Sequence, residues 1–274
     1  MEIHEIRKAI DGIVSDSAKS IEDRIAGVLT YRDELEISDK QEELKVDEIC
    51  YASLIDMLKK ENATMSNVED LMQLYTLLAE TFDEEESYPP IKEIAYEVIE
   101  MIRINMVPWE IIKETVPRLI DAVDDTVYHH TSYDLHLWLL KKAYEADDLT
   151  EEFKGRARRL LKLRILLVDS YRSERIFDRE LMEGIASLFT QAELVKIILQ
   201  PQIGTLRQDP VEFTYEWEDI YYEVEKRLDE RFANAPRQMG FCFMYWNAKR
   251  ELLKEEYGID WKSPAQMNPR VMFD

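Results

Sequence analysis

Carboxylates spaced about one helical turn apart are the first residues in this sequence that could do chemistry. Asp121, Asp124 and Asp125 lie in one short window, and Asp147 and Asp148 lie in another. Hard cations such as Mg²⁺ take oxygen ligands, so a window of this kind can form a magnesium site. The second window is also explained by the positive end of a following helix, which carboxylates stabilise. We therefore assign no catalytic residue, metal or cofactor, and keep Asp121, Asp124 and Asp125 as the metal-ligand alternative.

Three histidines, His129, His130 and His136, follow the first aspartate window. Imidazole and carboxylate groups together can bind a transition metal. The sequence has no HExxH or ExxH pair, and adjacent histidines on a helix point about 100° apart. We interpret these histidines as cap and loop residues rather than as metal ligands.

The spacing of the glycines excludes several classes of enzyme. The chain has 7 glycines, and no two of them lie closer than 15 residues. Phosphate-binding loops, dinucleotide fingerprints and nucleophile elbows need close pairs of glycines, because there the backbone approaches a phosphate or turns sharply. The sequence therefore contains none of these motifs.

A basic segment is the next candidate for binding. Lys154, Arg158 and Lys162 recur at i, i+4 and i+8, with Arg159 beside them. This spacing places the side chains on one face of a helix. Such a face can contact phosphates, a protein partner or acidic residues of the same chain. We favour the protein partner or internal pairing, because a net charge of −22 repels nucleic acid.

The C-terminal segment is rich in apolar residues for a chain end. Residues 241–246 read FCFMYW, and Trp261, Met267 and Phe273 follow after Gly258. Disordered tails are poor in such residues. We predict an extended tail that docks on the body of the protein. The alternative is a tail that inserts into the groove of a partner.

The rest of the sequence predicts helices that position these residues. Apolar residues recur at i, i+3, i+4 and i+7 in one window after another, as in Leu71, Leu74, Tyr75 and Leu78. No segment alternates cleanly between apolar and polar residues, so we expect no strands. The prediction is an all-α fold, either an orthogonal bundle or a solenoid-like array.

Helix starts are marked by residues that cap the first turn. Ser38 with Gln41 and Thr190 with Glu193 fit the capping box, in which two side chains satisfy backbone N–H groups reciprocally. We predict about ten helices. Their expected starts lie near residues 3, 17, 39, 67, 90, 108, 133, 151, 179 and 210, with another helix over 240–257.

The distribution of charge, and the positions of proline and glycine, indicate how the helices are organised. Residues 1–150 carry 35 acidic and 15 basic side chains, whereas residues 151–274 carry 22 and 20. We predict one elongated helical domain over 1–274. The segment 200–209 contains a proline and a glycine, and offers a subdomain seam that would divide 1–200 from 210–274.

These patterns together indicate an interaction protein. We expect a cytoplasmic helical adaptor or regulator with a protein partner, because no apolar run spans a membrane and the acidic N-terminus does not resemble a targeting peptide. The alternatives are an all-α metal-dependent enzyme with aspartate-bound magnesium and a nucleic-acid-linked regulator that acts through the basic helix. The residues expected to contact a partner are Lys154, Arg158, Arg159, Lys162, Trp261, Met267 and Phe273.

Overall fold

A computed structural model describes residues 3–61, 67–124, 128–167, 179–199 and 206–273. Every regular element in these ranges is a helix, 13 α-helices and two short 3-10 helices, which confirms the all-α prediction and roughly its count. The chain forms two compact units, the first made of 1–123 and 141–146 and the second of 124–140 and 147–274. The segment 200–209 falls within the second unit, and because 200–205 lie outside the described ranges the single domain and its seam stay predictions.

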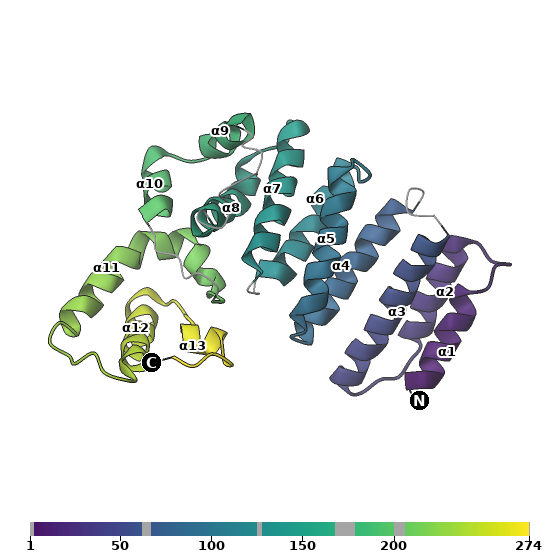
Figure 1. Ribbon diagram of the computed structural model, residues 1–274, viewed down its shortest axis with the longest axis horizontal. Coiled ribbons are helices and arrows are strands. Elements are labelled where there is room, and N and C mark those ends of the chain that lie inside the picture. Colours follow the sequence, from purple (N-terminus) through teal and green to yellow (C-terminus); the bar gives the residue numbers. More distant parts are fainter. Residues whose placement is uncertain (1–2, 62–66, 125–127, 168–178, 200–205, 274) are drawn as a thin grey trace. The chain divides into compact units, whose positions relative to one another are not determined.

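The first unit is built around its longest helix, α3, which packs against α1, α2 and α4 (Figure 1). Ten of the 21 residues of α3 are buried, among them Cys50, Leu54 and Leu58, so several of its sides face the core. The helices of this unit are α1 (Ile3–Val14), α2 (Ile21–Asp33), α3 (Lys40–Lys60), α4 (Val68–Glu84), α5 (Tyr88–Arg103), α6 (Trp109–Asp124) up to 123, and the end of α7 (His129–Glu145).

Charged pairs join α2 to α3 at the edge of this core. The Arg32 guanidinium donates to both carboxylate oxygens of Asp47, at 2.6 and 3.0 Å. The helix α3 begins one residue later than the capping box predicts, because the Asp39 side chain accepts from the backbone N–H of Glu42 at 2.9 Å. The predicted role of Ser38 as the cap is therefore wrong.

The second unit continues from the end of α6 with most of α7. Its α8 packs against α10, and α11 packs against η2 and α12. The capping box at Thr190 is confirmed: its N–H donates to Glu193 Oε2 at 2.7 Å, and the Glu193 N–H donates to Thr190 Oγ1 at 3.3 Å. The further elements are η1 (Glu151–Phe153), α8 (Lys154–Leu166), α9 (Arg179–Ser187), α10 (Gln191–Leu199), η2 (Pro210–Phe213), α11 (Tyr215–Arg231), α12 (Phe241–Tyr257) and α13 (Pro264–Met267).

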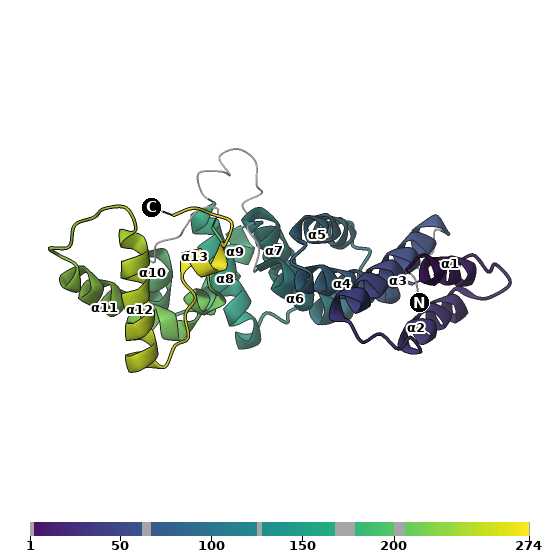
Figure 2. The ribbon, with the colours of Figure 1, turned by 90° about the horizontal axis from the view of Figure 1, so that it is seen from below.

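The tail docks on the second unit through an aromatic contact. The ring of Trp261 is buried and stacks on Trp217, with centroids 6.0 Å apart. Its indole N–H donates to Glu212 at 2.7 Å, and the next backbone N–H, that of Lys262, donates to Asp209 at 2.6 Å. Figures 1 and 2 show the chain after α13 returning towards the start of α12. The predicted docking of the tail is confirmed.

Among the helices of the described ranges, none combines the length and the apolar character needed to cross a bilayer.

Trp261→Ala should destabilise the second unit by about 3–5 kcal/mol, because it removes a large buried ring and leaves a cavity beside Trp217. Urea denaturation followed by far-UV circular dichroism measures the change. Met272→Ala is the control in the same tail: its side chain is 97% exposed, and the expected change is below about 0.5 kcal/mol. A chain truncated after Gly258 that melts like the full chain would contradict the docked tail.

Candidate functional site

The basic face of α8 points into the second unit. Arg158 is 2% exposed and Lys162 is fully buried. Both cations pair with Glu218 of α11, at 3.2 Å for Arg158 and 2.7 Å for Lys162. A buried charge requires a counter-charge, because desolvation of an unpaired ion is expensive. The sequence predicts that Arg158 and Lys162 contact either a partner or acidic residues of the same chain. The structure shows that both pair with Glu218 of the same chain.

The two ends of this face differ in exposure. Burial lowers the pKa of Lys162 to about 8, although the neighbouring Glu218 carboxylate favours the charged ammonium. The Lys162 ammonium also donates to the backbone carbonyl oxygen of Glu212 at 3.1 Å. Lys154, one-fifth exposed, pairs with Glu151 and Glu193 at 3.3 Å each. Only the first turn of α8 therefore presents part of the predicted cationic face to solvent.

Asp124 is the carboxylate partner of Arg159. Its Oδ2 lies 3.4 Å from Arg159 Nε and 3.7 Å from His136 Nε2, and the hydroxyl of Ser132 donates to its Oδ1. Burial opposes ionisation of Asp124, but Arg159, His136 and Ser132 outweigh it and hold the pKa below its ordinary value. Asp124, whose side chain is 22% exposed, is therefore a partly buried anion at neutral pH.

The hypothesis of a magnesium site requires Asp121 and Asp125 in addition to Asp124. Asp121 is exposed on α6, and Asp125 lies outside the described residues. Within the ranges that the structure describes, no group of three or more His, Cys, Asp or Glu side chains could hold a metal ion. Asp124 is instead surrounded by the cationic and hydrogen-bonding groups of the second unit.

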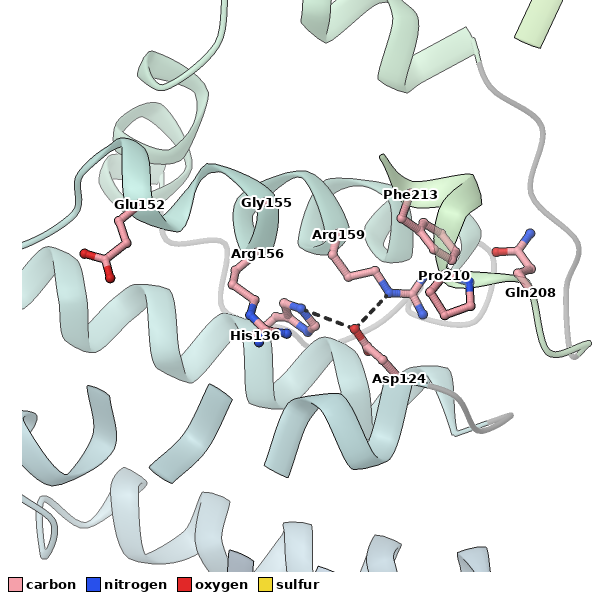
Figure 3. Close-up of a pocket in the computed structure, with 9 residues that line it drawn as sticks. All are labelled: Asp124, His136, Glu152, Gly155, Arg156, Arg159, Gln208, Pro210 and Phe213. Atoms are coloured by element: carbon pink, nitrogen blue, oxygen red, sulfur yellow. Dashed lines mark ion pairs between the residues drawn. The ribbon is translucent and has the colours of Figure 1, made fainter. Parts of the chain in front are cut away.

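A cavity of about 290 Å³ opens beside Asp124 (Figure 3). Its walls come from the end of α6, from α7, from η1 with the start of α8, and from η2 with the residue Gln208 before it. The Arg159 guanidinium lies 3.7 Å from the ring centroid of Phe213, which closes one side. Sequence reasoning missed this cavity, because its walls join four segments that no local pattern connects. The residues that line it include Asp124, His136, Arg156, Arg159, Gln208 and Phe213.

Apolar side chains are exposed at the start of α12 and at the end of the tail. Met239 is 87% exposed and Met272 is 97% exposed. The Trp246 ring of α12 packs edge-on against Phe243 of the same helix and against Phe273 of the tail, with centroids 5.6 and 5.1 Å apart. We call this region the C-terminal apolar surface; its exposed members are Met239, Phe243, Met244, Val271 and Met272.

The residues predicted in the tail divide between two roles. Trp261 and Met267 are buried in the second unit, where they fix the path of the chain. Phe273 is half-buried against Trp246 at the C-terminal apolar surface. A partner that docks on this surface would reach Phe273 directly, whereas the other two contact the chain itself.

Comparison with known protein families, with curated proteins and with solved structures finds no match to this chain. Its function must therefore be inferred from its own residues.

The stability of the second unit should fall as the pH is lowered from about 6.5 to about 4. Burial lowers the pKa of His129 and of His136 to about 4. As the pH falls, the imidazoles of the unfolded chain bind protons near pH 6.5, whereas those of the folded chain bind them only near pH 4. Protonation in this range therefore favours the unfolded state. The loss amounts to about 3 kcal/mol for each histidine.

Urea denaturation across this pH range measures the effect. His129→Asn and His136→Asn should each flatten the dependence of stability on pH, because each removes one titrating imidazole. A slope that stays unchanged in both variants would show that neither histidine is buried in its neutral form.

Proposed function

We propose that this protein is a helical interaction module, an adaptor or regulator, that docks an amphipathic helix with acidic residues on its C-terminal apolar surface. The observation that supports the proposal most is the exposure of Phe243 and Met272, whose segments meet where the Trp246 ring contacts both Phe243 and Phe273. Clustered apolar exposure of this kind marks a contact surface more often than a free surface, since water contact with apolar groups is unfavourable.

The composition of the surface suits a helical partner. Methionine side chains are flexible and polarisable, so they adapt to the shape of an apolar helix face. Phe243, Trp246 and Phe273 add rigid rings, and aromatic residues contribute strongly to binding at interface centres. A surface that combines flexible and rigid apolar side chains is one onto which an apolar helix face can pack.

Charge complementarity supports an acidic partner. Arg250 lies two helical turns after Phe243, on the same stripe of α12. Arg237 and Arg270 are exposed, and they precede α12 and the end of the tail. The nearest acid on the helix, Glu251, lies about 100° around the axis from Arg250. A partner with carboxylates beside its apolar stripe would meet these guanidinium groups.

The magnesium enzyme and the nucleic-acid-linked regulator are separate hypotheses. In the described residues no structural observation favours these two over docking at the C-terminal apolar surface. Arg158, Arg159 and Lys162, on which the nucleic-acid hypothesis relies, are buried and face carboxylates.

A displayed library of amphipathic helices with randomised polar positions tests the proposal. Selection on the full chain should enrich helices with an apolar face and a net negative charge. The selected helices should bind Phe243→Ser/Met272→Ser at least about tenfold more weakly, because interface anchors of this type contribute more than 1 kcal/mol each. Fluorescence anisotropy of the labelled helices gives the dissociation constants.

Tyr96→Ser/Ile104→Ser is the matched control, since it removes two equally large apolar side chains that are 43% and 59% exposed in the first unit. Its affinity for the selected helices should equal that of the unmodified chain. Equal weakening in both double variants, or enrichment of basic helices, would refute the proposed docking surface.

A further inference from the structure

The first unit contains a groove with a volume of about 310 Å³, between α1, α3 and the connection that joins α2 to α3. Residues 34–38 of this connection form one wall. Ile3, Leu35 and Ile37 contribute apolar side chains that stay partly exposed. We call it the N-terminal groove, and these side chains can accept an apolar side chain of a partner.

Three glutamates that line the N-terminal groove have no partner. Glu34, Glu36 and Glu42 are exposed, and within the described ranges their side chains form neither a hydrogen bond nor an ion pair. The described residues of the lining include no lysine, arginine or histidine. Carboxylates around one groove repel each other, and a cation that approaches the groove is attracted by all three.

The cations on either side of the connection are engaged elsewhere. Arg32 donates to both carboxylate oxygens of Asp47, and the Lys40 ammonium lies 2.8 Å from a carboxylate oxygen of Glu84. The wider charge acts in the same direction as the three glutamates, because residues 1–150 carry 35 acidic and 15 basic side chains. The negative potential of the groove is therefore left for a cationic partner.

The backbone of the connection also has free hydrogen-bonding groups. The N–H groups of Leu35 and Ile37 donate to the carbonyl oxygens of Arg32 and Leu35, at 3.2 and 3.1 Å. At Glu36 and Ser38, by contrast, neither the N–H nor the C=O group has a partner among the described residues. Alternate residues with free backbone groups are typical of the edge of a strand, to which an extended peptide can add.

These backbone groups select the conformation of the partner. A helix uses the N–H and C=O groups of its interior residues for its own hydrogen bonds, so it cannot pair with the connection. An extended segment offers both groups, and its side chains point alternately to opposite sides. An apolar side chain of such a segment can then meet Leu35 and Ile37, while basic side chains before and after it reach the glutamates.

We infer that the N-terminal groove binds an extended segment of a partner protein in which lysine or arginine residues flank an apolar residue. The backbone of the segment pairs with residues 36–38, its apolar side chain contacts Leu35 and Ile37, and its cations pair with Glu34 and Glu42. This site is independent of the proposed docking of a helix, because the N-terminal groove and the C-terminal apolar surface share no residue.

Selection of a displayed library of unstructured linear peptides on the full chain tests the inference. We expect the enriched peptides to include a class in which lysine or arginine lies on both sides of an apolar residue. Fluorescence anisotropy of labelled peptides of this class gives their dissociation constants. Absence of the class from the enriched peptides would overturn the inference. Displacement of these peptides by an equal concentration of spermine, a polycation without an apolar side chain, would overturn it as well.

Glu34→Gln/Glu36→Gln should bind peptides of this class about fivefold more weakly, because two exposed ion pairs are lost. Glu69→Gln/Glu93→Gln is the matched control. It removes the same charge from two exposed glutamates of the first unit that lie outside the groove lining, and it should bind like the unmodified chain. Equal weakening in both double variants would show that only the general charge of the chain attracts the peptides, and would refute the groove as the site.

Methylation of single backbone nitrogens of a selected peptide tests the extended pairing, because it removes a donor without altering the protein. At the residues that pair with the connection, methylation should weaken binding about fivefold, as the loss of one hydrogen bond predicts. An affinity that methylation changes at no position would contradict the pairing. Phe243→Ser/Met272→Ser should bind the peptides like the unmodified chain, so failure of this groove and failure of the proposed docking surface are distinguishable.

Discussion

The second unit depends on the pairing of the α8 cations with two carboxylates that the sequence places far away. Glu218 faces Arg158 and Lys162, and Asp124 faces Arg159. Removal of either carboxylate would leave a buried cation with too little counter-charge, which costs several kcal/mol. These pairs therefore restrict how α8 can pack against α11 and against the end of α6.

The inward face of α8 also explains the chemistry around it. Since Asp124 must remain ionised to balance Arg159, the neutral ring of His136 meets an acceptor rather than a donor. The cavity lined by Asp124, His136 and Arg159 lies at this place. The interactions that stabilise the helix thus also create a small polar site. Asp124, His136 and Arg159 belong to patterns that the sequence shows separately, but no motif connects the three.

The helices and several of their ends follow from local physics, and the sequence was sufficient to predict them. Thr190 and Glu193 cap one another as their spacing indicates. The start of α3 shows the limit, because Ser38 and Asp39 are both good caps and the spacing does not choose between neighbours. The tail was predictable for a similar reason: Trp261 is too apolar for a free chain end, and the structure buries it.

The candidate site was not predictable to the same degree, because side-chain burial depends on tertiary packing. A helical face with Arg158 and Lys162 looks the same in sequence whether it points to solvent or to Glu218. Nothing in the sequence around Gln208 predicts that this residue lines the same cavity as Asp124. The exposure of Met272 could not be predicted from the sequence either, because an apolar residue in the tail is equally consistent with burial against the body of the protein.

The accessibility of Lys162 tests the inward orientation of α8 most directly. Brief acetylation of the native chain, followed by mass spectrometry of its peptides, gives the relative reactivity of each lysine. The account predicts that Lys162, which is fully buried, stays unmodified while the exposed Lys226 and Lys262 are acetylated. Acetylation of Lys162 at the rate of those two lysines would contradict it.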